Sequence, residues 1–320
     1  KTANYLRSAL QNLKASKEDV IVFPTAHLNE LKAVAKIYNE NSPSFILQLH
    51  QFYPPLSDSD KINTNGINVR LNGAFRDVFY KINNKRIRVA TVPVPALNKK
   101  LSKLSPVKLE QLPIPFLLSG LKNAARNEFA VGFFGDSRKE KGLLKLLVAI
   151  PSIVKKFPKL KIVIQIQNPR CFTPKEVKKI SYLTNNLKQL ANMEFVEGVL
   201  SFDDYYKYLT KCSAIIIPYD PGHYKIRLSG VAIECGALGI PVITTGHTWA
   251  GNMVKIDKIT GTTFSFTNDQ KLFEKRLARA INKIIKNETI YRKMARKHDK
   301  FLLNNFSAKN YFKKIKLWSH

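Results

Sequence analysis

Four residues near the middle of the chain have the spacing of a site that binds phosphate and hydroxyl groups together. Ser229 and Gly230 open a helix predicted over 229–238, and Glu234 lies about one turn into it. Free N–H groups at a helix start attract an anion, and a carboxylate can accept two hydrogen bonds from a sugar diol. Arg227 adds a cation just before the helix. The pattern therefore favours a ligand with a phosphate and a sugar.

A second charged segment, the turn GFFGDSRKEKG over 132–142, leads from a predicted strand into a predicted helix. Gly135 permits a tight turn, and Arg138 and Lys141 supply two cations beside the helix start. Arginine can bind a phosphate through two hydrogen bonds, and lysine acts as a point charge. Charged turns of this kind are common, so this segment predicts a phosphate site only in combination with the helix start at Ser229.

Both segments follow strands of one predicted α/β unit, which positions them. In open parallel sheets ligands bind at the carboxyl ends of the strands, so the two segments are expected at one edge. The strands of this unit are predicted at 128–136, 161–167, 193–198, 213–218, 241–245 and 262–266. Its helices are predicted at 141–155, 174–190, 202–211, 229–238, 269–286, 288–304 and 308–317.

The first part of the chain also alternates strands and helices. Strands are predicted at 19–25, 44–52 and 87–94, with a short one ending in 112–116, and helices at 3–15, 28–40, 74–82 and 96–104. It has no glycine-rich strand-to-helix turn near its start, so its opening strands are taken to be missing. The stretch 117–127 reads as a linker.

Composition sets the outer limits. A chain of 320 residues suggests two domains, and no apolar run reaches the roughly 18 residues that span a bilayer. Three widely spaced cysteines, Cys171, Cys212 and Cys235, fit reduced thiols that pack as small hydrophobic residues. We therefore expect a cytoplasmic protein.

The net charge of +30 favours anionic partners. The last fifty residues hold 15 Lys and Arg against 3 Asp and Glu. An anionic membrane face or a phosphorylated sugar would suit this charge, and a lysine-rich composition on solvated helices would explain it equally well. Without an arginine-rich arm or an aromatic RNA-binding signature, nucleic acid is not expected as a partner.

At this point the sequence resembles a known family. The segments GFFGDSRKEKG and IIPYDPGHYKIRLSGVAIECGALGIPVITT, about ninety residues apart, are similar to the C-terminal domain of retaining glycosyltransferases of the GT4 type. The resemblance implies a GT-B-like fold, with two Rossmann-like domains that face each other across a cleft. The boundaries that follow are an N-terminal acceptor domain (1–118), a nucleotide-sugar domain (119–306) and a returning helix (307–320).

The resemblance also implies roles for individual residues. Arg138, Lys141 and Glu234 would act in catalysis, the cations on the donor diphosphate and the acid on the ribose. His50 would lie near the transferred sugar or the acceptor. The residues expected to bind the donor are Gly135, Val199, Leu200, Tyr224, Arg227, Ser229, Gly230 and Val231.

One departure concerns the sugar. The family usually has two glutamates eight positions apart, and the position eight before Glu234 holds Ile226. A subgroup with the pattern Tyr-x-x-Arg-x-Ser-Gly-Val, matched here from Tyr224, lacks that first acid. The residue that contacts the sugar is left open among Tyr224, Arg227 and Trp249.

No metal and no bound cofactor are expected. Asp58 and Asp60 form a D-x-D, which binds metal in the other major glycosyltransferase fold, but here they follow Pro54-Pro55 in a polar loop. The remaining histidines share no metal-ligand spacing. The nucleotide-sugar itself would be the substrate.

These patterns predict a metal-independent, retaining transfer of a sugar from a nucleotide-sugar to a glycan or lipid-linked acceptor, in the synthesis of cell-surface polysaccharide or glycoconjugate. The inner face of a membrane is a candidate location. Two alternatives remain: a nucleotide-sugar epimerase or hydrolase of the same fold, and a degenerate transferase that only binds. A nucleic-acid binder ranks below them.

Overall fold

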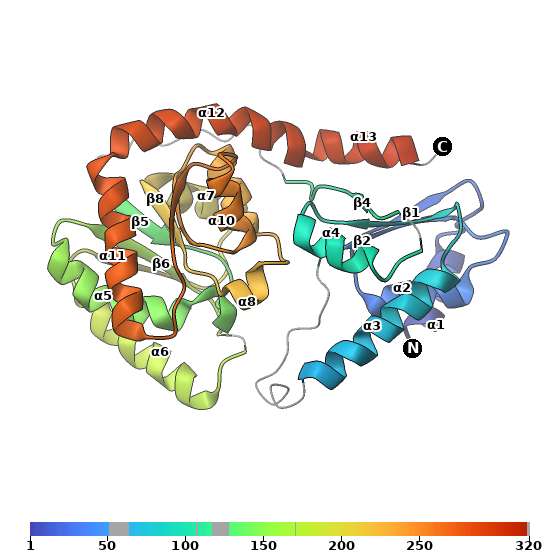
Figure 1. Cartoon of the computed structure of the whole chain (residues 1–320), viewed down its shortest axis with the longest axis horizontal. Helices are drawn as coiled ribbons and strands as arrows, with labels where there is room; N and C mark the ends of the chain where they lie inside the picture. The colour runs from blue at the N-terminus through green and yellow to red at the C-terminus, as the bar shows by residue number, and fades with distance from the viewer. Residues whose placement is uncertain (51–63, 107, 117–127, 170, 319–320) are drawn as a thin grey trace. The chain divides into compact units, whose positions relative to one another are not determined.

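The computed structural model describes residues 1–50, 64–106, 108–116, 128–169 and 171–318. The chain forms two compact units (Figure 1). The first contains Lys1–Pro115, Ile226–Leu228 and Phe306–His320, and the second contains Phe116–Lys225 and Ser229–Asn305. The predicted linker over 117–127 and the D-x-D lie outside the described residues.

The first unit is built on a four-stranded sheet with every neighbouring pair parallel. Its strand order is β1-β2-β3-β4. Parallel strands need crossover connections, and helices between the strands supply them. The strands are β1 (Val20–Ala26), β2 (Ser44–Leu49), β3 (Ile87–Thr91) and β4 (Glu110–Gln111).

Helices cover both faces of this sheet (Figure 1). They are α1 (Thr2–Asn12), α2 (Leu28–Ile37), α3 (Thr64–Lys81), α4 (Pro95–Ser102) and α13 (Ala308–Trp318). The last helix belongs to this unit although it lies about two hundred residues further along the chain. Tyr311 and Ile315, one turn apart on α13, form an apolar cluster with Ile46, Ala90 and Leu112.

The second unit holds a six-stranded sheet, also entirely parallel, in the order β10-β9-β8-β5-β6-β7. The strands are β5 (Ala130–Phe133), β6 (Lys161–Ile166), β7 (Met193–Glu197), β8 (Ala214–Ile217), β9 (Val242–Thr245) and β10 (Gly261–Phe264). The chain builds outward from β5 in one direction, then crosses to β8 and builds in the other. The switch point, where such sheets bind ligands, therefore lies between β5 and β8.

One apolar core holds the second unit together. Side chains of α5, α6 and α11 pack on one face of the sheet with strand residues such as Val131, Ile164 and Ile216. The helices of this unit are α5 (Leu143–Lys156), α6 (Pro174–Leu187), α7 (Phe202–Lys211), α8 (Pro221–Tyr224), α9 (Gly230–Ala237), α10 (Trp249–Lys255) and α11 (Gln270–Lys286), with most of α12 (Glu288–Phe306). A short 3-10 turn, Lys139–Lys141, precedes α5.

Two parallel α/β sheets confirm the predicted fold class, while the bounds of two predicted elements were wrong and two short helices were missed. The strand expected to end in 112–116 is Glu110–Gln111, because Pro113 and Pro115 lack the N–H that a ladder requires. The helix expected at 74–82 begins at Thr64, since Gly73 costs a helix only about 0.5–1 kcal/mol. Helices α8 and α10 were not anticipated.

One further expectation needs correction. Cys212 and Cys235 are buried as expected, but Cys171 is exposed. On α13, Tyr311 and Ile315 define the buried side, and Phe312 exposes 63% of its surface. Among the described residues no helix is long and apolar enough to cross a membrane.

Candidate functional site

The two charged segments predicted from the sequence meet at the switch point of the second sheet. One is the turn after β5, and the other is the start of α9, which follows β8. Gly135 shows how close they are: a Cβ at that position would lie 3.0 Å from Lys141 Nζ and 3.5 Å from Val231 Cγ2. The φ angle of +99° at Gly135 also suits glycine, as the tight turn required.

Arg138 is held by both carboxylates of its own turn. Its Nε lies 2.7 Å from Asp136 Oδ2, and its Nη1 lies 3.5 Å from Glu140 Oε1. Its Nη2 also donates a hydrogen bond of 3.1 Å to the hydroxyl of Tyr224. Burial opposes the charge of Arg138, but Tyr224 and the two acids outweigh it and raise the pKa of the guanidinium. The cation is fixed in place and always charged.

Lys141 is more deeply buried, with 7% of its surface exposed. Its ammonium forms an ion pair with Asp136 Oδ1 and lies 5.7 Å from the centre of the Tyr219 ring. Burial lowers the pKa of Lys141, and the attraction of Asp136 only partly offsets this. Asp136 therefore bridges both cations that the sequence nominated for a diphosphate.

The start of α9 is arranged as a helix terminus that can receive an anion. Ser229 is the N-cap residue, and its Oγ accepts a hydrogen bond of 3.2 Å from the amide of Ala232. The amides of Gly230 and Val231, in the first turn, have no intrahelical acceptor in this position. The ring of Phe116 borders this terminus, because a Cβ of Gly230 would lie 3.5 Å from it, at ordinary contact distance.

Glu234, deeper in α9, is held by two tyrosines of α7. Its carboxylate accepts hydrogen bonds from the hydroxyls of Tyr205, at 2.6 Å, and Tyr206, at 3.4 Å. Burial raises the pKa of Glu234, although both hydrogen bonds and the nearby charge of Lys141 act in the opposite direction. The acid is thus positioned by its neighbours rather than free in solvent.

The remaining predicted donor residues are distributed around this centre. Tyr224 packs on Tyr219, with ring centres 4.2 Å apart, and is almost fully buried. Arg227 is also buried and groups with the first unit, so its part in donor binding stays a prediction.

A buried glutamine connects two of the predicted loops. Gln165 of β6 accepts a hydrogen bond of 3.0 Å from the amide of Gly135 and donates one of 3.0 Å to the carbonyl of Gly198. Gly198 precedes Val199, which is 85% exposed, and Leu200. These two residues were expected to bind the donor, and Gln165 fixes their loop to the turn that carries the cations.

Two residues predicted on the sugar or acceptor side have distinct surroundings. His50 follows β2 at its carboxyl end, and burial lowers its pKa. Its Nε2 is buried and has no hydrogen-bond partner among the described residues. Trp249 begins α10 in the second unit and is 3% exposed. Their contact with a sugar stays a prediction.

The sequence reasoning missed the residues that hold the site together. They are Phe116, Asp136, Glu140, Gln165, Tyr205, Tyr206 and Tyr219. A glutamine inside the apolar strand KIVIQI was a usable signal, because a polar residue buried there needs partners. Within the part of the chain that the structure describes, no three His, Cys, Asp or Glu side chains group as metal ligands.

The structure has two parallel α/β sheets, and two cations and an open helix start lie at the switch point of the second sheet. This is the arrangement of a GT-B glycosyltransferase. The chain belongs to the family of glycosyl transferases group 1, whose model matches residues 122–301. No curated protein matches the sequence.

Solved structures share the fold at low sequence identity. Sucrose-phosphate synthase from Thermosynechococcus elongatus has a TM-score of 0.71 at 15% identity, over 99% of this chain and 76% of that one. A glycosyltransferase from Rickettsia africae has a TM-score of 0.67 at 16% identity, over 99% and 79%. HepE from Anabaena, solved with UDP and glucose, has a TM-score of 0.65 at 14% identity, over 99% and 80%.

Proposed function

We propose that this glycosyltransferase transfers a sugar from a nucleoside diphosphate donor bound at the edge of the second sheet. One observation carries the proposal: Arg138, Lys141 and the first amides of α9 converge at the switch point, with Gly135 and Val231 in close approach. HepE, with the same fold, was solved with UDP and glucose and with UDP-glucose. The diphosphate would lie on the cations, and Glu234 would hold the ribose.

The chemistry follows from the charge that develops. Cleavage of the bond between the anomeric carbon and the diphosphate leaves negative charge on the leaving group and positive charge on the sugar. Arg138, Lys141 and the amides of α9 would stabilise the leaving group. The acceptor hydroxyl would form the new bond to the anomeric carbon, and its proton would pass to a phosphate oxygen of the leaving group.

Three finer points belong to the same proposal. Retention of the anomeric configuration rests on the resemblance of the two motifs to retaining enzymes, and proton NMR of the product tests it. Independence from metal rests on the two cations, Arg138 and Lys141, that would face the leaving group, and unchanged rates in EDTA would support it. The acceptor is proposed to be a glycan or a lipid-linked sugar.

Calorimetry with UDP, GDP and ADP, followed by transfer assays with the matching sugar donors, tests the function. At least one nucleotide should bind, and Arg138→Ala or Lys141→Ala should lower the transfer rate about 10²–10³-fold, as loss of an oxyanion donor does. Lys139→Ala is the matched control, because Lys139 lies in the same turn and its ammonium pairs with Glu176 of α6. Full turnover in both variants with every donor would overturn the assignment, and donor turnover without acceptor would favour an epimerase or hydrolase.

A further inference from the structure

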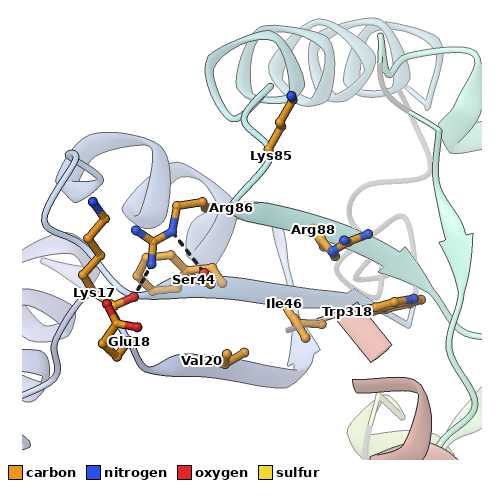
Figure 2. Close-up of a pocket in the computed structure, with 10 residues that line it drawn as sticks. Lys17, Glu18, Val20, Ser44, Ile46, Lys85, Arg86, Arg88 and Trp318 are labelled. Atoms are coloured by element: carbon orange, nitrogen blue, oxygen red, sulfur yellow. Dashed lines mark hydrogen bonds between the residues drawn. The ribbon is translucent and has the colours of Figure 1, made fainter. Parts of the chain in front are cut away.

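A cavity of about 390 Å³ lies in the first unit, at the amino ends of its parallel strands (Figure 2). Val20 and Ser44 are the first residues of β1 and β2, and Arg86 and Arg88 lie on either side of Ile87, which begins β3. This volume is within the range of small-molecule sites, roughly 300–1,000 Å³.

The cavity is distinct from the edge of the sheet that carries His50. A strand of six residues is about 20 Å long, and His50 follows β2 whereas Ser44 begins it. Ligands of open α/β sheets bind at the carboxyl ends, so the amino ends are not accounted for by the proposed function. Every residue that lines the cavity belongs to the first unit.

The rim of the cavity is strongly basic. Four cations line it against a single acid, Glu18; the cations are Lys17, Lys85, Arg86 and Arg88. No hydrogen bond or ion pair holds the ammonium of Lys17 or Lys85 among the described residues. Arg88 is paired with Glu110 only at 4.0 Å, with both side chains well exposed. Such a surface pair contributes little, so these cations are available to an anion.

Arg86 is the cation that the fold holds in position. Its Nε donates a hydrogen bond of 3.2 Å to Ser44 Oγ, and its Nη2 donates one to the carbonyl of Lys17. These bonds use two of the five N–H groups of a guanidinium. The remaining N–H groups can serve a ligand, and the guanidinium is already ordered, which reduces the entropy lost on binding.

The other end of the cavity is apolar. Figure 2 shows Val20 and Ile46 between the side chain of Arg86 and the indole of Trp318. Trp318 and Val20 pack against the cluster that Ile46 forms with Tyr311 and Ile315, so one side of the indole is supported by protein. An indole face is a good surface for the apolar face of a sugar ring.

We propose that this cavity binds a sugar that carries an anionic group, phosphate, sulfate or carboxylate, with the ring on Trp318 and the anion on Arg86, Arg88 and the two lysines. A charged monosaccharide and one residue of a charged glycan present the same chemistry. The proposal does not depend on the transfer reaction, because it concerns binding at the opposite edge of the first sheet.

Titration of the full chain with glucose 6-phosphate, inorganic phosphate and glucose tests the proposal. The chain has two tryptophans, and Trp249 is buried in the second unit, so a change of fluorescence that Trp318→Phe abolishes reports on the cavity. Glucose 6-phosphate should produce that change and bind more tightly than phosphate, while glucose alone should not bind. Binding should weaken as salt is added.

Matched double variants locate the site. Lys85→Ala with Arg88→Ala should weaken glucose 6-phosphate at least tenfold, because a hydrogen bond to a charged group contributes about 10- to 100-fold in affinity. Lys32→Ala with Lys36→Ala, two exposed lysines of α2, should leave it unchanged. Lys85→Gln with Arg88→Gln repeats the test if the alanine pair fails to fold.

Several results would overturn the proposal. They are equal binding of glucose and glucose 6-phosphate, phosphate binding as tightly as the sugar phosphate, or no binding at low salt. If Arg138→Ala lost binding of glucose 6-phosphate and the double variants of Lys85 and Arg88 kept it, the ligand would be assigned to the second unit. Binding only to vesicles that contain phosphatidylglycerol would assign the cations to a lipid surface. A charged oligosaccharide that competes with glucose 6-phosphate would support the glycan form.

Discussion

Asp136 and Glu140 balance the charge of Arg138 and Lys141 before any ligand arrives. A diphosphate that binds there must compete with Asp136, which contacts both cations. The same carboxylate also holds the cations in position, so its effect on binding and its effect on the rate have opposite signs.

Asp136→Asn should therefore tighten nucleotide binding and slow transfer. We expect UDP, or whichever nucleotide binds, to gain roughly fivefold in affinity at low salt, because one like charge near the diphosphate is removed. The rate at saturating donor should fall, since both cations lose a partner that orients them. Calorimetry and transfer assays measure the two effects. Glu176→Gln, which removes the partner of Lys139, is the control, and weaker nucleotide binding by Asp136→Asn would contradict the expectation.

Glu234 should make both binding and stability depend on pH. Burial raises its pKa above the ordinary value of 4.5, so the folded state favours the protonated acid. The stability that this contributes is complete below pH 4.5 and is lost as pH rises through the raised pKa. Nucleotide binding should change in the opposite direction, because an ionised carboxylate accepts hydrogen bonds from both ribose hydroxyls.

Glu234→Gln should remove both pH dependences. Chemical denaturation between pH 4 and pH 8 measures the first, and calorimetry with nucleotide over the same range measures the second. Glu197→Gln, at an exposed carboxylate that pairs with Lys188, is the matched control. The difference between wild type and Glu234→Gln, in the free energy of unfolding and in nucleotide affinity, should change with pH. If it did not, another group would control the pH dependence.

At the scale of elements, the connection into α5 depends on one glycine. Gly142 has a φ of +81°, and a Cβ there would lie 2.5 Å from the carbonyl oxygen of Pro218, which follows β8. Gly142 therefore lets the turn that carries the cations pack directly against the end of the neighbouring strand. An added methyl group would push the two apart.

Gly142→Ala should destabilise the second unit by about 1–3 kcal/mol, the cost of a strained backbone conformation. Gly73→Ala in α3 is the matched control: a Cβ there has nothing within 4 Å, and it should stabilise by about 0.4–1 kcal/mol. Hydrogen exchange of β5 and β8, compared with β1 and β2, assigns each effect to its unit. Equal effects of the two substitutions would contradict this interpretation.

Helices and strands were predictable from the sequence where local residue patterns determine them. Contacts between residues that lie far apart in the chain were not. Apolar strands alternating with helices were enough for two parallel sheets, and the two charged turns were found from their residue types. The hydroxyls of Tyr205 and Tyr206 on Glu234 could not be found in this way, because they come from a different helix. The pairing of Asp136 with both cations required the actual turn, in which one carboxylate contacts Arg138 and Lys141 together.

At the scale of the whole molecule, α13 shows how a distant segment completes a unit. Tyr311 and Ile315 are buried against Ile46, Ala90 and Leu112, which lie about 200–270 residues earlier in the chain. The residue pattern predicted a helix there, and the resemblance to the family implied that this helix returns to the first part of the chain. Which side of the helix is buried became visible only in the structure.

Ile315→Ala should destabilise the first unit by about 2–4 kcal/mol, as truncation of a core isoleucine does. Leu317→Ala, two residues away and 68% exposed, should change stability by less than about 0.5 kcal/mol. Hydrogen exchange should show the loss in β1, β2 and β3, while nucleotide binding by the second unit persists. Equal protection of these strands in both variants would show that α13 does not stabilise them.

The position of α13 in the chain has a consequence for biosynthesis. A ribosome adds about 5–20 residues per second, so roughly 10–40 seconds separate the emergence of β4 from that of α13. During that interval Ile46, Ala90 and Leu112 lack the helix that covers them in the finished protein. The first unit thus begins to be made before the second and is completed after it, and this part of its apolar core stays uncovered until α13 has been synthesised.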